Sequence, residues 1–227
     1  MKRYLSQEAL KLLACGLMLL DHIGAVLLPS LGLRLIGRLA FPIFCFLLSE
    51  GASHTRNPRR YGLRLLIAMV LSELPFDLLF YGRPSWAHQN VMVTLLLAFL
   101  AIQAVDRCKG LWKLTAMVPF VLLAELLRAD YGGVGVCMVL LFHLTRQRPK
   151  KLMLQLAGLL ALNAMLPSAK FYGIPIQLFA AAALVPIGLY SGQKATRSPA
   201  IQWGFYLFYP LHLTLLWLIF LYLWIYC

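Results

Sequence analysis

The chain has 227 residues, 61% of them hydrophobic, and carries a formal net charge of +13. Its mean hydropathy of +0.77 is too high for a soluble globular domain and indicates an integral membrane protein built of helices. Because no stretch is long and polar enough to fold separately in water, we expect one all-α transmembrane domain over residues 1–227. Most of the positive charge lies in short loops between apolar segments, which indicates membrane topology and no nucleic-acid partner.

Nine apolar segments form the predicted polytopic helical bundle, because about 20 apolar residues cross a bilayer as a helix. In chain order they cover residues 9–28, 33–50, 62–80, 91–105, 111–127, 133–145, 152–166, 174–190 and 203–226. The sixth is the weakest, and a re-entrant segment is the alternative for it. Lys2 and Arg3 precede the first segment as in a signal peptide. However, Glu8 and Lys11 interrupt the apolar stretch before Cys15, so we expect an uncleaved first span.

The loop charges predict the orientation of these segments. If the N-terminus is cytoplasmic, 16 of the 21 basic residues fall on the cytoplasmic side and only Arg83, Arg128 and Lys170 fall outside. Lysine and arginine are enriched in cytoplasmic loops, so this bias predicts a cytoplasmic N-terminus and an external C-terminus. Losing the sixth span would move the cluster between Arg146 and Lys151 outside, so we keep it. The expected location is the inner (cytoplasmic) membrane, with many passes through lipid.

Ionisable residues interrupt the apolar segments at matched depths. Asp21 and His22 stand side by side in the first span. A charged residue at the centre of a membrane helix costs roughly 2.5–3.5 kcal/mol even on a mild scale, and a histidine can exchange protons near neutral pH. In the same outer half of the membrane, the second span carries Arg34 and Arg38 and the third carries Glu73 and Asp77, while His212 lies near the midplane of the last span.

Two interpretations of this polar set stay open from the residues alone. In the first, the charges form a structural ion-pair network, with Asp21 against Arg38 and either Glu73 or Asp77 against Arg34. In the second, they line a polar cavity with a catalytic or transport role, because charges at this depth are costly if they only join helices.

Other polar residues lie at the membrane surfaces. Glu50, His54 and Arg56 end the second span on the cytoplasmic side, either as a solvated helix end or as an entrance for an anionic cytosolic ligand. Gln89 and Asn90 open the fourth span at the outer surface. The five cysteines are scattered through apolar stretches, so neither disulfides nor a metal site is expected.

Short motifs along almost the whole chain resemble the TraX family, membrane proteins of conjugation systems that acetylate the N-terminus of pilin. The motifs are Leu20-Asp21-His22-Ile23-Gly24, Ile36-Gly37-Arg38-Leu39-Ala40-Phe41-Pro42-Ile43-Phe44, Ser49-Glu50-Gly51 followed by His54-Thr55-Arg56-Asn57, Ser72-Glu73-Leu74-Pro75-Phe76-Asp77, Gln89-Asn90-Val91 and Phe208-Tyr209-Pro210-Leu211-His212. Residues 107–200 carry little of the resemblance. The family is similar in turn to multipass acyltransferases that deliver acetyl from cytosolic acetyl-CoA to an acceptor at the far face.

The resemblance implies an acetyltransferase with acetyl-CoA as cosubstrate, no metal, and membrane lipid and an extracytoplasmic acceptor as partners. The acceptor would be a protein N-terminus, a glycan or a small amine. His22 matches the key histidine of the broader group and would act as base or nucleophile. Asp21 would pair with Arg38, Glu73 or Asp77 would hold the imidazole, and the oxyanion would be stabilised by Arg34, Arg38 or Asn90. Donor or acceptor binding would involve Arg34, Glu50, His54, Arg56, Gln89, Asn90 and His212.

Two other functions compete with acetyl transfer. A proton-coupled transporter or lipid-linked flippase could relay protons through the buried acids and His22. Such proteins tend to show inverted repeats with broken helices in matching halves, and the sequence shows no convincing repeat. The third function is that of a non-enzymatic membrane assembly factor.

Overall fold

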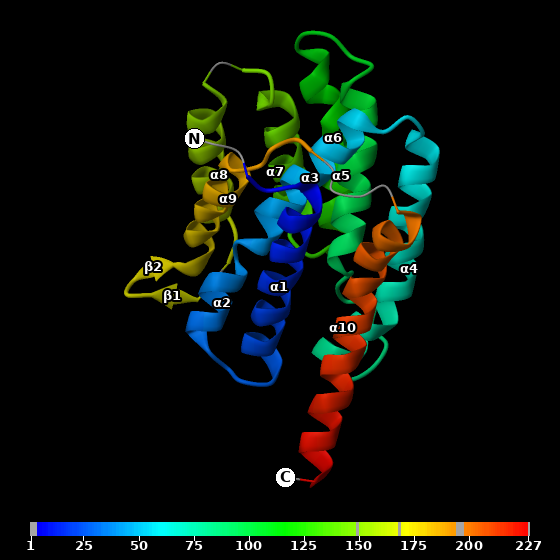
Figure 1. The fold of residues 1–227 in the computed structure, drawn as a ribbon, viewed down its shortest axis with the longest axis vertical. Helices are drawn as coiled ribbons and strands as arrows, with labels where there is room; N and C mark the ends of the chain where they lie inside the picture. Colours follow the sequence, from blue (N-terminus) through cyan, green and yellow to red (C-terminus); the bar gives the residue numbers. More distant parts are fainter. Residues whose placement is uncertain (1–3, 149, 168, 194–197, 227) are drawn as a thin grey trace. The chain divides into compact units, whose positions relative to one another are not determined.

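The computed structural model describes residues 4–148, 150–167, 169–193 and 198–226, and these residues are almost entirely helical (Figure 1). The helices are α1 (Gln7–Val26), α2 (Leu31–Gly37), α3 (Ala40–His54), α4 (Pro58–Tyr81), α5 (Val91–Val105), α6 (Trp112–Leu126), α7 (Gly132–Thr145), α8 (Lys151–Ala164), the 3-10 helix η1 (Ile176–Ala183), α9 (Leu184–Gly188) and α10 (Pro199–Tyr226). Two short antiparallel strands, β1 (Lys170–Phe171) and β2 (Ile174–Pro175), form a hairpin before η1.

Seven of the nine predicted segments each coincide with one α-helix. The eighth, residues 174–190, is divided into β2, η1 and α9, and the second is also broken. Residues 33–50 divide into α2 and α3, with a turn at Arg38 and Leu39. Pro42 supplies the physical reason, because it has no N–H to donate to the carbonyl of Arg38 and its ring crowds that carbonyl. In the first turn of a new helix, as Pro42 is in α3, neither problem arises. The break therefore places Arg38 at the C-terminal cap of α2.

Among the described residues, three helical stretches are long and apolar enough to cross a membrane. They are Gln7–Val26, Leu31–His54 and Ala200–Tyr226. The end of the last stretch is aromatic and open, with Trp224 78% and Tyr226 72% exposed, and such side chains are enriched where helices meet the membrane surface. Four of the six other predicted segments contain shorter apolar helices, at Val91–Val105, Gly132–Thr145, Lys151–Ala164 and Ile176–Gly188. Nine spans and their orientation stay predictions.

The chain folds as two compact units that share α3 and α4. The first unit draws on residues 1–44, 70–85 and 168–227. In it, α1 packs against α2 and α10, and α2 also contacts η1. Ser6 caps the start of α1 by accepting the Ala9 N–H at 3.2 Å, and Ser30 likewise caps α2. These contacts place α2 and the distant α10 against α1, with η1 against α2.

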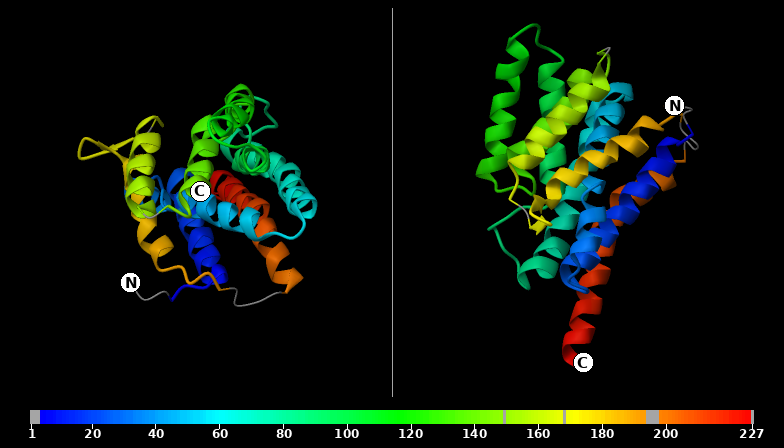
Figure 2. Two further views of the ribbon diagram at one scale, coloured as in Figure 1. Left: turned by 90° about the horizontal axis from the view of Figure 1, so that it is seen from above. Right: turned by 90° about the vertical axis from the view of Figure 1, so that its left-hand side faces the viewer.

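The second unit draws on residues 45–69 and 86–167. Here α5, α6 and α7 pack against one another, and α8 packs against α7 (Figures 1 and 2). Ile102, Met138 and Phe142 are almost fully buried in this group. The division describes how the chain packs, and the expected single transmembrane domain stays a prediction.

Candidate functional site

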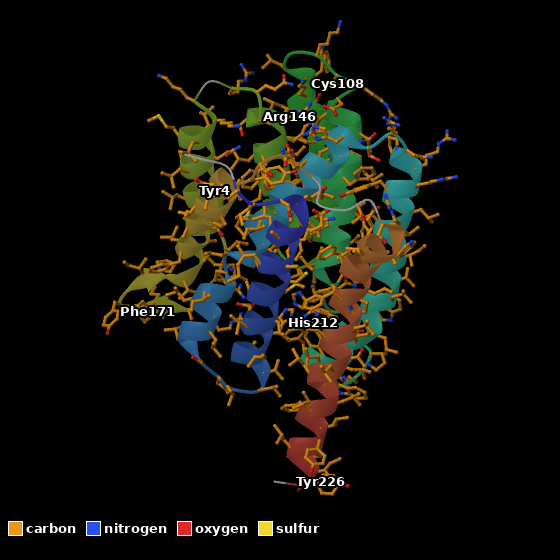
Figure 3. All side chains as sticks on the ribbon, in the orientation of Figure 1. Tyr4, Cys108, Arg146, Phe171, His212 and Tyr226 are labelled. Atoms are coloured by element: carbon orange, nitrogen blue, oxygen red, sulfur yellow. The ribbon has the colours of Figure 1, made fainter. Side chains whose placement is uncertain are left out.

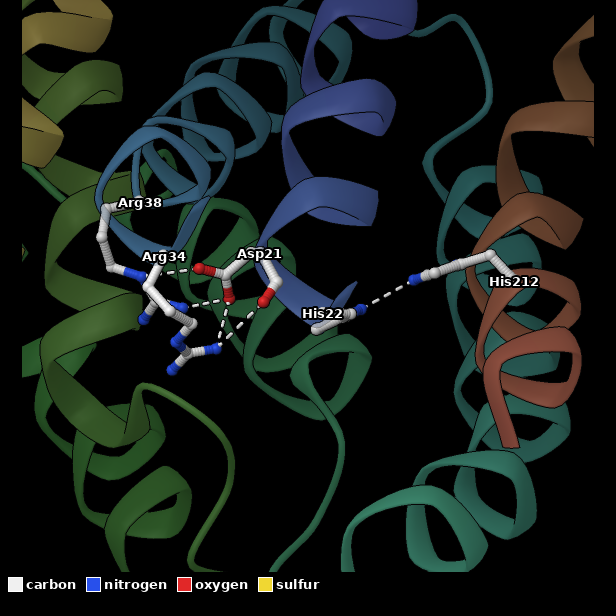
Figure 4. A network of polar contacts seen from close by, with 5 residues as sticks. All are labelled: Asp21, His22, Arg34, Arg38 and His212. Atoms are coloured by element: carbon white, nitrogen blue, oxygen red, sulfur yellow. Dashed lines mark hydrogen bonds and ion pairs between the residues drawn. The ribbon is translucent and has the colours of Figure 1, made fainter. Parts of the chain in front are cut away.

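Asp21 lies on α1 in the first unit and binds two arginines. Its Oδ1 accepts a hydrogen bond from Arg38 Nε at 3.0 Å, and its Oδ2 accepts bonds from Arg38 Nη2 and from Arg34 Nη1, the latter at 2.8 Å (Figure 4). The two-point contact with Arg38 is the strong fork geometry that guanidinium and carboxylate groups form. We call these three residues the arginine cluster. Asp21 and Arg38 are buried, and their opposite charges offset each other inside the unit.

Local sequence explains how the arginine cluster assembles. Arg34 and Arg38 are four residues apart, which places both side chains on the same face of α2. Gly37 lets that face approach α1, because a β-carbon built on Gly37 would lie 2.6 Å from the Asp21 Cα, far inside normal contact. The glycine and the two arginines thus act together to seat α2 on α1.

His22, the next residue, points to a different helix. Its Nδ1 lies 2.7 Å from Nε2 of His212 on α10, and the two ring planes differ by only 6° (Figure 4). A nitrogen–nitrogen distance this short between nearly parallel planes means that the rings meet edge to edge as a hydrogen bond. We call these two residues the imidazole pair. The pair joins segments 190 residues apart.

The hydrogen bonds around the imidazole pair assign its protons when both rings are neutral. The Nδ1 of His212 lies 2.8 Å from the carbonyl oxygen of Phe208, which can only accept, so this nitrogen carries hydrogen. The Nε2 of His212 is then an acceptor, and Nδ1 of His22 donates to it. The remaining lone pair is on Nε2 of His22, which no described residue contacts by a hydrogen bond. This nitrogen can act as a base or a nucleophile.

Aromatic rings surround the imidazole pair. Phe80 meets the His22 ring edge to face at a centroid distance of 5.6 Å, and Tyr209 lies 6.4 Å from it. Phe208 stacks on His212 at 4.8 Å. His212 is buried and His22 is half-buried, so the reactive nitrogen lies in an apolar setting at the edge of the packed unit.

The comparisons with known proteins bear on this arrangement. The family model described as TraX protein matches residues 6–220, nearly the whole chain. The chain belongs to the TraX family. It is 32% identical over 236 residues to a probable fimbrial assembly protein FimC, serogroup H1, of Dichelobacter nodosus, covering 91% of this chain and 92% of the relative. It is 34% identical over 92 residues to an uncharacterized protein of Rickettsia prowazekii (strain Madrid E), covering 40% of this chain and 34% of that protein. No solved structure matches.

Family membership and the three long apolar helices establish a membrane protein, and they confirm the resemblance found in the sequence. The residues matched by the TraX model include both His22 and His212. The expected Asp21–Arg38 pair is present. In this TraX protein, Asp21 and Arg38 therefore form the ion pair of the structural interpretation, and His22 lies outside that ion pair.

One expectation for the acids of α4 is wrong. The partner of His22 is His212, where Glu73 or Asp77 was expected. Arg34 binds Asp21, whereas Asp77 accepts the Ser85 N–H at 2.8 Å through Oδ2 and closes the loop after α4. Asp77 is 4% exposed, and a buried carboxylate that accepts a backbone N–H in this way stabilises the turn.

The other predicted site residues lie in the second unit, and several serve its own structure. Asn90 caps α5 by accepting the Met92 N–H at 2.9 Å, while its amide nitrogen donates to the Met69 carbonyl at 3.1 Å. The expected oxyanion role would have to compete with these bonds. Gln89 exchanges backbone hydrogen bonds with the segment at residues 128–130, and its side chain reaches the Trp86 carbonyl at 3.4 Å.

At the end of α3, His54 Nδ1 lies 2.9 Å from the Glu50 carbonyl oxygen and 3.9 Å from the Glu50 carboxylate. His54 and Arg56 are exposed, as expected for either a solvated helix end or a surface that meets a cytosolic anion. Sequence reasoning placed His212 among the binding residues and missed its role as the partner of His22. A histidine in an otherwise apolar helix was the available signal, because such a residue needs a polar partner.

Proposed function

We propose that this TraX protein transfers an acetyl group from cytosolic acetyl-CoA to an acceptor on the other side of the cytoplasmic membrane. The observation that carries the proposal is the imidazole pair, in which His212 fixes the ring of His22 and leaves Nε2 available. In the direct route, Nε2 removes a proton from the acceptor amine or hydroxyl. The acceptor then bonds to the thioester carbonyl carbon, the carbon–sulfur bond breaks, and the sulfur leaves as a thiol after taking up a proton.

A second route uses the same nitrogen as a nucleophile. Nε2 bonds to the acetyl carbon, the carbon–sulfur bond breaks, and the sulfur leaves as a thiolate. The acceptor amine or hydroxyl then bonds to the acetyl carbon, the carbon–Nε2 bond breaks, and the proton lost by the acceptor balances the one that the thiolate takes up. The two routes differ in one observable, because only the second leaves labelled acetyl on the protein when no acceptor is present. Both require a neutral His22 with its lone pair directed away from His212.

The arginine cluster has a positioning role in this proposal. It fixes α1 against α2 and so determines where His22 meets α10. Arg34 is half-buried and has an exposed portion, so it is the member available for charge stabilisation of an oxyanion. Glu50, His54 and Arg56 supply the cytosolic approach for the donor.

The proposed topology is nine spans with a cytoplasmic N-terminus and an external C-terminus. It is supported by the distribution of basic residues, 16 on the cytoplasmic side against three outside. Reporters fused after residue 226 test it directly. A periplasmic phosphatase reporter should be active and a cytoplasmic fluorescent reporter should be dark, and the opposite pattern would overturn the topology.

Purified protein in proteoliposomes with radiolabelled acetyl-CoA tests the activity. The acceptor panel contains a peptide with the N-terminal sequence of a fimbrial subunit, the same peptide with a blocked amine, and a glucosamine-containing glycan. The relative described as a fimbrial assembly protein supports the peptide as first choice. Label should appear in the free peptide, in the glycan or on His22, and none in the blocked peptide. Absence of label from every acceptor and from the protein would contradict the proposal.

A non-enzymatic assembly factor is the second candidate, and the description of the Dichelobacter nodosus relative favours it. In this case the protein would promote fimbrial assembly by contact alone. Cells that carry His22→Ala in place of the wild-type gene distinguish the two. If these cells make normal fimbriae whose subunits lack the acetyl group, the protein is an acetyltransferase whose activity fimbrial assembly does not need. If the fimbriae and their modification both match the wild type, His22 has no catalytic role and the assembly factor is favoured.

A further inference from the structure

A basic cavity lies in the second unit, at the end where the loop between α5 and α6 meets the loop between α7 and α8. Figure 3 places Cys108 and Arg146, one from each loop, at this same end. The two loops meet because α5, α6 and α7 are packed together and alternate in direction along the chain. The cavity has a volume of about 310 Å³ and is lined by Asp106, Lys113, His143, Leu144, Arg146, Gln147 and Arg148.

The charges of the cavity are unbalanced. Three of its lining side chains are cations, and its only lining carboxylate is Asp106. Asp106 Oδ1 lies 2.8 Å from His143 Nε2, so the carboxylate is turned onto the imidazole. Within the described ranges, no carboxylate lies within ion-pair distance of Lys113, Arg146 or Arg148. Cations gathered in a hollow without acidic partners attract an anionic ligand.

Ser53, His143 and Asp106 also form a row that invites a different interpretation, that of a catalytic triad. The hydrogen bonds argue against it. Ser53 Oγ donates to the Ser49 carbonyl at 2.8 Å, the usual bond of a serine to the preceding helical turn. Its distance to His143 Nδ1 is 3.5 Å, longer than the reach of an activated nucleophile. With its proton donated to the Ser49 carbonyl, the hydroxyl has none to give to the imidazole, and His143 contacts Asp106 through Nε2.

We propose that this cavity, the basic pocket, binds the phosphate groups of a small anion that carries at least two phosphate charges. Arginine recognises phosphate through its planar fork of N–H donors, and Lys113 adds a compact charge beside it. The volume lies at the lower end of the roughly 300–1,000 Å³ typical of small-molecule sites, which suits a diphosphate group better than a whole large ligand. The inference does not depend on acetyl transfer, because it concerns the phosphates and not the reacting group.

The phosphates could belong to a soluble nucleotide-like ligand or to a lipid headgroup. Both present the same chemistry to the basic pocket. The loop charges place residues 106–113 and 146–151 on the cytoplasmic side of the predicted topology, where either source is available. The experiment therefore needs one arm for each source.

Binding is measured by calorimetry on the full-length protein in nanodiscs of phosphatidylcholine, with inorganic pyrophosphate and, separately, unacylated coenzyme A as probes. The test variant is Arg146→Gln with Arg148→Gln. The control variant is Arg107→Gln with Lys109→Gln, which removes two exposed cations of the α5–α6 loop that do not line the cavity. The test variant should bind pyrophosphate about tenfold or more weakly, as expected for losing charge-assisted hydrogen bonds, and the control should stay within about twofold of wild type.

Equal weakening in both double variants, or no saturable binding of pyrophosphate to wild type at millimolar concentration, would overturn the proposal. Circular dichroism checks that each variant is folded, and Arg146→Lys with Arg148→Lys provides a second test in which charge is kept and binding should be partly retained. The lipid arm repeats the titration in nanodiscs that contain cardiolipin, a lipid whose headgroup carries two phosphates. Loss of pyrophosphate binding there supports the basic pocket and identifies the lipid headgroup as its phosphate source, whereas unchanged binding identifies a soluble ligand.

Discussion

Two polar groups that start from adjacent residues of α1 have opposite surroundings. In the arginine cluster, Asp21 receives bonds from two guanidiniums and its charge is fully engaged. In the imidazole pair, His22 donates one hydrogen bond and keeps a lone pair that no described residue uses. The side chains of neighbouring residues in a helix point about 100° apart, so Asp21 contacts residues of α2 and its C-terminal cap, while His22 contacts α10. The difference separates a group whose polar atoms are engaged between helices from a group that keeps an available lone pair.

The largest effect is expected when His22, the member of the imidazole pair with an available lone pair, is removed. In His22→Ala, acetyl transfer should fall about 10²–10⁴-fold, because the general base or nucleophile is lost. Thermal stability should change little, since the side chain is half-buried and makes one hydrogen bond. The rate is measured with radiolabelled acetyl-CoA and the acceptor that the wild type prefers.

The control for that measurement is His88→Ala, an exposed histidine in the second unit. It should keep both the rate and the stability of the wild type. Transfer at the wild-type rate in His22→Ala would show that the imidazole pair is not the catalytic group, even if the protein proves to be an acetyltransferase.

The second prediction breaks the arginine cluster. Asp21→Ala removes the carboxylate that lies between two guanidiniums, and loss of one partner of a buried ion pair typically costs about 3–5 kcal/mol. Reversible unfolding in detergent should show a destabilisation of this order, with a smaller one in Asp21→Asn because the amide can still accept hydrogen bonds. If Asp21→Ala is as stable as wild type and yet loses transfer, Asp21 belongs to the reacting group and the separation drawn above fails.

Local features of the sequence predicted the helices and the partner of Arg38. Apolar segments of the right length became helices, and spacing alone placed Arg34 and Arg38 on one face of α2. The break before Pro42 was also readable in principle, since proline cannot serve a helix interior without cost. These features depend only on residues within a few turns of one another.

Contacts between distant segments were harder to predict. The bond between His22 and His212 spans 190 residues, whereas matched depth favoured Glu73 or Asp77 as the partner of His22. Only the packing of α10 against α1 brings His212 to this position. Asp106 and His143 lie at the ends of two predicted segments that are distant in sequence, and the cavity that they line exists only where two loops meet.

The third prediction tests the close approach that the arginine cluster requires. Gly37→Ala places a methyl group against Asp21, where neither backbone can easily move, and should destabilise the protein by about 1–3 kcal/mol. Gly16→Ala is the matched control on α1, because nothing lies within 4 Å of its added β-carbon. Replacing an unhindered helical glycine should be neutral or stabilise by about 0.5–1 kcal/mol. Equal effects in the two variants would mean that α2 is not seated on α1 as described.

The smallest effect is expected when His212, the partner of His22 in the imidazole pair, is replaced. His212→Leu removes the acceptor for His22 Nδ1, and transfer should fall roughly tenfold, the equivalent of one hydrogen bond of about 1.4 kcal/mol. His212→Gln should recover much of the rate, since its amide oxygen can accept the same bond, although it cannot share a proton as an imidazole does. A purely structural role would instead lower the stability of both variants and leave the rate per folded molecule unchanged. A transfer rate that is higher in His212→Gln than in His212→Leu therefore identifies His212 as the residue that positions His22. A higher rate in His212→Leu would mean that His22 acts without this support.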